Sequence, residues 1–173
     1  MVSLFVLAVS LLALRGLGGL GVERLSSWRA SGRGALVTMF LFTGTSHFTG
    51  MKHDFAAMIP PPLPDDLWLI YLTGAFEVAG AVGLLIPRTR RLAGICLALL
   101  LVALFPANVY AAHGEIPFRG EAATPLWIRT PMQLLYVGLV LWTSVKARPT
   151  EVLPRGKEPV VGHDRASRRG ATS

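Results

Sequence analysis

Five long apolar stretches, separated by short polar segments, dominate the pattern of this chain. They cover residues 2–22, 34–51, 67–86, 92–112 and 130–146. A helix needs about 20 mostly apolar residues to cross the hydrocarbon core of a bilayer, and each stretch comes close to that length. The pattern therefore predicts an all-α membrane protein with five spans.

The first stretch is the shortest, because only the segment before Arg15 is uninterrupted. An arginine at mid-helix costs about 2.5–3.5 kcal/mol on insertion scales. We expect the Arg15 side chain to extend to the interface and the helix to end near Gly21. The alternative is a cleaved signal peptide, but that requires a charged leading segment and a small-residue cleavage site. Neither is present, which favours a span.

The charge pattern adds an orientation. The chain is 52% hydrophobic and only 16% charged, with a net charge of +7. Such a basic balance is compatible with nucleic acid binding, but the Lys and Arg residues alternate between segments instead, numbering 4, 1, 3, 2 and 7 after successive spans. Cytoplasmic loops are the ones enriched in Lys and Arg. We therefore expect an N-terminus outside, a C-terminus in the cytoplasm, and no nucleic acid partner.

The segment after the last stretch and the lone cysteine complete the organisation. Residues 148–173 are rich in Pro, Gly and charge without apolar periodicity, which predicts a disordered basic cytoplasmic tail that can rest on anionic lipid. The single cysteine, Cys96, excludes an internal disulfide and a thiol redox pair. We expect Cys96 to be a small packing residue within the fourth span.

Glu77 stands near the middle of the third stretch, where a bare carboxylate is costly. Gly74, Glu77, Gly80 and Ala81 fall on one helical face, and small residues at this spacing let a neighbouring helix approach closely. We therefore expect Glu77 to face the bundle interior. In that setting its carboxyl group must be protonated or paired.

Other spans bring polar residues to the outer half of the membrane in the predicted topology. His47 lies near the outer end of the second span, and Asn108 near that of the fourth. Gln133 and Arg129 lie at the start of the fifth. With Glu77 they predict a polar cluster at one level. The structural alternatives are an interfacial His47, interhelical hydrogen bonds from Asn108 and Gln133, and a protonated Glu77 bonded to a neighbouring backbone.

Metal binding and catalysis by the chain alone have little support. His47 and His53 are six residues apart, so they do not share a helix face, and no metal-ligand motif of paired histidines occurs. Phosphate-binding loops and nucleophile elbows are also absent from the sequence. We predict no metal site and expect that the chain is not an enzyme on its own.

Several segments resemble the DoxX-like family of small membrane proteins in order and spacing. They are "FLFTGTSHF", "MIPPPLP", "YLTGAFEVAGAVGLLIPRTRRLAG", "FPANVYAA" and "WIRTPMQLLY", and the resemblance covers about 34–142. It implies a four-helix transmembrane core, here with one extra N-terminal helix. The family's polar positions map onto His47, Glu77, Asn108, Arg129 and Gln133.

Some members of that family look like parts of membrane redox assemblies, including a subunit associated with thiosulfate–quinone oxidoreduction and a partner of superoxide dismutase. The resemblance thus implies an accessory subunit of a redox assembly that holds a quinone and works with a redox partner. Two alternatives stay open. One is a structural or assembly protein without a ligand, and the other is a small proton- or cation-coupled transporter acting as a homo-oligomer.

Overall fold

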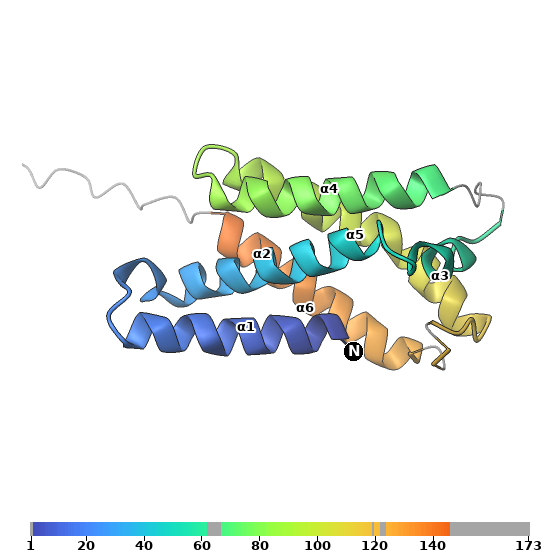
Figure 1. The fold of residues 1–173 in the computed structure, drawn as a ribbon, viewed down its shortest axis with the longest axis horizontal. Helices are drawn as coiled ribbons and strands as arrows, with labels where there is room; N and C mark the ends of the chain where they lie inside the picture. The colour runs from blue at the N-terminus through green and yellow to red at the C-terminus, as the bar shows by residue number, and fades with distance from the viewer. Residues whose placement is uncertain (1, 62–66, 119, 122–123, 146–173) are drawn as a thin grey trace, which may run out of the picture.

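A computed structural model describes residues 2–61, 67–118, 120–121 and 124–145 (Figure 1). The predicted tail, residues 148–173, lies outside the described residues. Five long helices carry the fold. They are α1 (Val2–Gly19), α2 (Trp28–Ser46), α4 (Leu67–Leu85), α5 (Arg90–His113) and α6 (Leu126–Ser144). A 3₁₀ turn, η1 (Glu23–Leu25), precedes α2, and a short helix, α3 (Lys52–Ala57), follows it.

The predicted all-α class is confirmed for the described residues, which contain helices, loops and one isolated bridge between Phe118 and Glu121. Three of the described helices, fewer than the five spans expected, are long and apolar enough to cross a membrane: Val2–Gly19, Leu67–Leu85 and Arg90–His113. They leave large apolar side chains exposed, such as Phe5, Leu12 and Leu99. Exposed apolar surface on this scale is typical of a lipid-facing protein, and these features indicate a membrane protein.

Helix α2 lies at the centre of the bundle, because it contacts α1, α4 and α6 (Figure 1). Among the long helices, α4 also packs on α5 and α5 on α6. The largest fully buried apolar side chains are Phe40 and Leu36 on α2, Leu84 on α4, Leu97 on α5 and Val140 on α6.

Two glycines let α2 and α4 touch backbone to backbone. A Cβ added at Gly44 would lie 3.1 Å from the Gly74 carbonyl oxygen. One added at Gly74 would lie 2.6 Å from the His47 Cβ and 2.9 Å from the Gly44 carbonyl oxygen. No larger residue fits here without separating the helices. The predicted small-residue face of α4 is confirmed, since Gly74, Glu77, Gly80 and Ala81 are all buried.

The structure also differs from the sequence-based expectations. Helix α2 begins at Trp28, before the apolar stretch, because Ser27 caps it by accepting a hydrogen bond from the Ala30 backbone N–H. Helix α3 was not predicted, since one turn and a half carries no measurable periodicity. The expectation for Cys96 was wrong: its side chain is exposed on α5. Because the residues around Cys96 are apolar on every side of the helix, the sequence does not show which face of α5 is buried.

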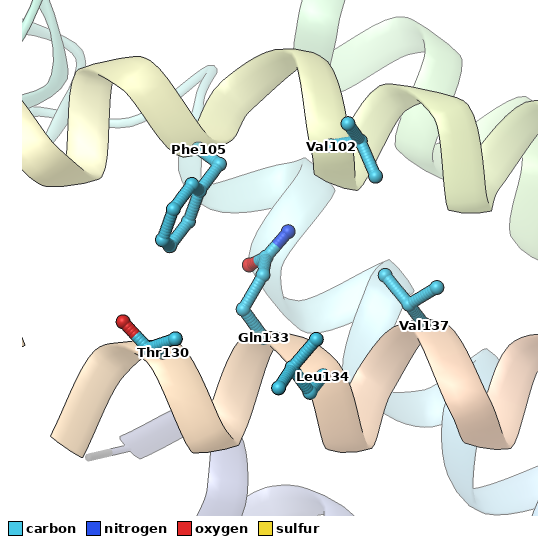
Figure 2. A pocket seen from close by; sticks show the side chains of 6 residues that line it. All are labelled: Val102, Phe105, Thr130, Gln133, Leu134 and Val137. Carbon is cyan, nitrogen blue, oxygen red and sulfur yellow. The ribbon is translucent and has the colours of Figure 1, made fainter. Parts of the chain in front are cut away.

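Between α5 and α6 lies a hollow of about 180 Å³ that is open on one side (Figure 2). Apolar side chains line most of it, and Gln133 projects into it from α6. The lining residues are Val102, Phe105, Thr130, Gln133, Leu134 and Val137. Pro106 follows this segment of α5 and has no N–H to offer the carbonyl one turn earlier, which loosens the helix there.

Replacing Gly74 with alanine should separate α2 from α4 and lower the free energy of unfolding by about 1–3 kcal/mol, as overpacking does elsewhere. The matched control is Gly138→Ala in α6, where a Cβ meets nothing within 4 Å. That change should be neutral or stabilising by up to about 1 kcal/mol. Thermal unfolding of both variants in mild detergent makes the comparison, and equal midpoints would contradict the close contact.

Candidate functional site

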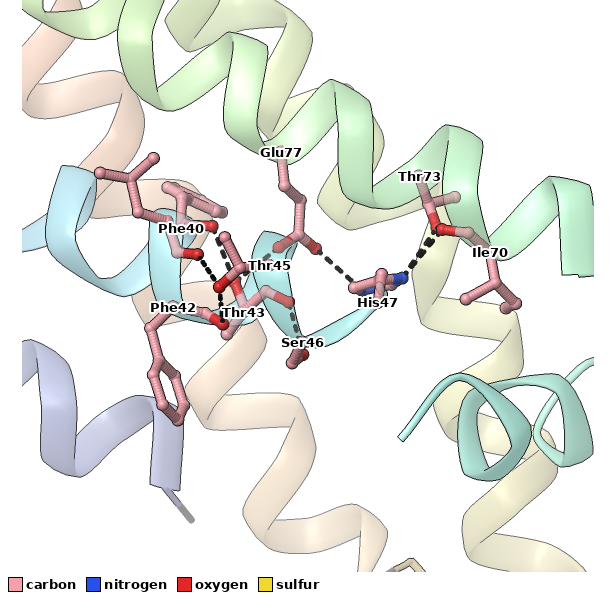
Figure 3. Close-up of polar contacts among 10 residues, drawn as sticks. Phe40, Phe42, Thr43, Thr45, Ser46, His47, Ile70, Thr73 and Glu77 are labelled. Carbon is pink, nitrogen blue, oxygen red and sulfur yellow. Dashed lines mark hydrogen bonds and ion pairs between the residues drawn. The ribbon is translucent and has the colours of Figure 1, made fainter. Parts of the chain in front are cut away.

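The polar group at the α2–α4 contact is built around Glu77 (Figure 3). The Thr43 hydroxyl donates to Glu77 Oε2 at 2.5 Å. The His47 Nε2 atom lies 3.8 Å from Glu77 Oε1, and both side chains are less than a tenth exposed. The close approach at Gly44 and Gly74 brings these residues together, because all three project into the same narrow interface. The carboxyl group expected to face the interior therefore has two polar neighbours.

The other nitrogen of His47 fixes the tautomer of the ring. His47 Nδ1 lies 3.1 Å from the Ile70 carbonyl oxygen and 3.2 Å from the Thr73 hydroxyl oxygen, whose own proton goes to Ile70. A carbonyl oxygen only accepts, so Nδ1 carries a proton and donates it. In the neutral ring Nε2 is then an acceptor that faces Glu77. The Nε2 and Oε1 atoms are 3.8 Å apart, beyond hydrogen-bond length, so a single proton held by the pair resides either on the carboxyl group or on Nε2.

Aromatic residues cover the outer side of His47. The Phe55 ring, on α3, stacks on the imidazole with 4.3 Å between ring centroids and 10° between planes. Phe118, in the segment between α5 and α6, lies against Phe55 with centroids 5.1 Å apart. Neither residue was predicted from the sequence, because α3, which carries Phe55, was not predicted and Phe118 lies in a connecting segment without periodicity. Together they shield the pair from the polar end of the bundle.

A second polar group lies between α5 and α6. Arg129 Nη1 donates to Asn108 Oδ1 at 2.7 Å, and Arg129 Nε donates to the Thr124 carbonyl oxygen at 3.0 Å. One turn further along α6, Gln133 Nε2 donates to the Leu101 carbonyl oxygen at 2.5 Å. This group adjoins the hollow, since Gln133 lines it.

The five predicted residues thus form two groups instead of one. His47 and Glu77 join α2 to α4, whereas Asn108, Arg129 and Gln133 join α5 to α6. Among the described residues no hydrogen bond links the two groups. Topology gives the depth of a residue in the membrane but not its direction around the bundle, which is why the expected single cluster divides. The same described residues hold no group of three potential metal ligands.

Taken together, the helices and these buried polar groups define an all-helical, membrane-type bundle. Residues 36–145, most of the chain, match the family described as "Domain of unknown function (DUF8561)". The chain belongs to this family. Neither the curated proteins nor the solved structures contain a match. The family description assigns no activity, so the functional argument rests on the geometry.

Removing the Thr43 hydroxyl should leave Glu77 with one polar neighbour fewer. Thr43→Val keeps the shape, and we expect it to lower the free energy of unfolding by about 1–3 kcal/mol, the cost of leaving a buried partner unsatisfied. Thr45→Val is the control, because Thr45 is exposed and bonds only to carbonyls of its own helix. Thermal unfolding compares the two, and equal losses would mean that the Thr43–Glu77 bond contributes nothing.

Proposed function

We propose that this chain is a DoxX-like, multi-pass protein of the cell membrane that serves as an accessory subunit of a quinone-linked redox assembly. The observation that carries the proposal is the apolar-walled hollow between α5 and α6, whose lining residues include Gln133. Its rim is exposed: Val102 is 57% and Leu134 69% exposed, so the opening faces the surroundings that lipid would occupy. A flat, apolar ring with carbonyl oxygens suits such a site.

In this proposal, N–H groups of Gln133 and Arg129 donate to the carbonyl oxygens of a quinone bound in the hollow. An amide nitrogen carries two N–H groups, and Gln133 uses one of them on Leu101. Arg129, one turn away on α6, uses two of its five donors within the described residues. A quinone accepts two electrons and two protons to become a quinol. In this proposal a redox partner supplies the two electrons and the surrounding water supplies the two protons, one of which the His47–Glu77 pair holds within the bundle.

The proposed topology has five spans, with the four-helix core formed by α2, α4, α5 and α6 and the extra N-terminal helix α1. The N-terminus lies outside and the C-terminus in the cytoplasm, as the alternation of basic segments favours. Single cysteines in a Cys96→Ser background test this orientation. A membrane-impermeant maleimide should label Gly50→Cys in intact cells and leave Glu23→Cys unlabelled, and the reverse pattern would contradict it.

A second candidate is a structural or assembly protein without a ligand. Its support is that Thr43, His47, Thr73 and Glu77 all find partners within their own group. Such a closed arrangement fixes the register of two helices without needing a ligand.

Filling the hollow separates the two candidates. We expect the wild-type protein, purified from its native membrane in mild detergent, to carry a quinone detectable by mass spectrometry. Val102→Phe should reduce its occupancy at least about ten-fold, because the larger ring fills space in the hollow and overpacking costs about 1–3 kcal/mol. Leu99→Phe is the control, because Leu99 is exposed on the same helix but does not line the hollow.

The proton-holding role is tested in the same preparation. Glu77→Gln retains hydrogen bonding but cannot titrate, so we expect a folded protein with bound quinone and slowed quinone reduction in membranes. If no variant carries a quinone and Glu77→Gln behaves as the wild type, the structural candidate is favoured.

A further inference from the structure

The inner end of the bundle in the proposed topology is strongly basic. The α1–α2 and α4–α5 connections lie together at this end, beside the C-terminal end of α6 (Figure 1). One acidic residue, Glu23, accompanies seven arginines in the described part of this end. The arginines are Arg15, Arg24, Arg29, Arg33, Arg88, Arg90 and Arg91. Across the described residues the single ion pair is His47–Glu77, so no carboxylate there neutralises these arginines.

Arg33 and Arg90 are the two of these arginines that donate side-chain hydrogen bonds to backbone carbonyls in the described residues. Arg33 Nη1 donates to the Thr143 carbonyl oxygen of α6 at 3.4 Å, and Arg90 Nε donates to the Leu84 carbonyl oxygen of α4 at 3.2 Å. Both side chains are half-buried and lie beside the C-terminal end of α6, because Arg33 bonds Thr143 there and Gly94, one turn after Arg90, lies against Ser144. Each guanidinium has five N–H groups and uses one of them in these contacts. Two partly desolvated cations at the same end of the bundle favour an anion near them.

The helix ends add to this preference. Arg90 and Arg91 begin α5, and Arg29 stands in the first turn of α2. The N-terminal end of a helix carries partial positive charge, which favours anions and disfavours cations. Basic residues at two such helix ends therefore increase the positive charge at this end of the bundle. A bound anion would reduce the repulsion between these charges.

Two tryptophans mark the depth of this end. Trp28 and Trp142 are 58% and 44% exposed. Arg15 lies over the Trp28 ring at 5.1 Å and Arg29 over the Trp142 ring at 5.7 Å. Exposed tryptophans are enriched at the level of lipid headgroups. An anion available at that level is the phosphate of a phospholipid.

We propose that Arg33 and Arg90 form a clamp for the phosphate group of an anionic phospholipid. Guanidinium groups bind phosphate oxygens through paired hydrogen bonds, so two of them from different helices can hold one phosphate. A competing occupant is the segment from residue 146 onward, which contains three carboxylates. That segment has a net charge of +4, however, so it adds to the positive charge overall. The lipid is the occupant that the charge balance favours.

The test uses the full-length protein, stripped of lipid in mild detergent and titrated with phosphatidylglycerol or with phosphatidylcholine of the same acyl chains. Native mass spectrometry gives the dissociation constant of the first bound lipid. We expect Arg33→Gln with Arg90→Gln to weaken phosphatidylglycerol binding at least about 30-fold, because each change removes charge-assisted hydrogen bonds from a guanidinium to the phosphate. Arg24→Gln with Arg88→Gln removes the same charge from exposed positions of the same end and should change it about three-fold or less.

Several results would overturn the proposal. Equal losses in the two double variants would mean diffuse surface charge, and equal affinity for phosphatidylcholine would mean that the anion is irrelevant. Full competition by millimolar inorganic phosphate would point to a soluble ligand. If phosphatidylglycerol binds only after Glu151→Gln, Glu158→Gln and Asp164→Asn, the C-terminal segment is the occupant.

A second double variant that keeps both charges tests the proposal in case Arg33→Gln with Arg90→Gln does not fold. Arg33→Lys with Arg90→Lys retains both charges but loses the paired hydrogen bonds, so we expect about five-fold weaker binding. Unchanged affinity in this folded variant would contradict the clamp.

Discussion

The contact between α2 and α4 at Gly44 and Gly74 is the constraint on which the rest of the structure depends. An ionisable group in an apolar bundle is costly unless it has polar partners within reach. The two glycines bring the backbones so close that Thr43 and His47 reach Glu77 directly. The same close packing places His47 against Gly74, and the Phe55 ring stacks on the His47 imidazole. The close packing of α2 on α4 is therefore also what gives the buried Glu77 carboxyl group its polar partners.

Polar chemistry is divided along the length of the bundle. Arg129 with Asn108 lies toward one end of the α5–α6 interface, and Phe118 and Phe55 shield His47 from the connecting segments at that end. The opposite end carries arginines without acidic partners in the described residues. Between the ends, the hollow beside Gln133 offers space next to a hydrogen-bond donor. The proposed quinone and lipid sites therefore lie in different regions of the bundle and use different residues.

Much of this could be predicted from the residues. The helical class follows from the apolar stretches, and the spacing of Gly74, Glu77 and Gly80 correctly indicated the buried face of α4. The partnership of His47 with Glu77 was among the expected contacts. Depth along a helix can be counted in residues, so the levels of these groups were accessible without a structure.

The neighbouring helix toward which each polar side chain points could not be predicted by counting residues. Asn108, Arg129 and Gln133 face an interface of their own, because the neighbours of each helix depend on packing among all five. Phe55 was overlooked because α3 is too short to show periodicity. Thr43 was visible beside His47 in sequence, but a threonine in a helix ordinarily bonds its own backbone, as Thr45 does. Its bond to Glu77 depends on the close approach of α4.

We infer that Glu77 and His47 together hold one proton inside the α2–α4 contact, on one residue or the other. Infrared difference spectroscopy of the purified protein between acidic and basic pH tests this inference. We expect a protonated-carboxyl band that shifts in heavy water, disappears in Glu77→Gln and changes position in His47→Gln. A carboxyl band that His47→Gln leaves unchanged would show that the protonation of Glu77 is independent of His47, and would contradict this inference.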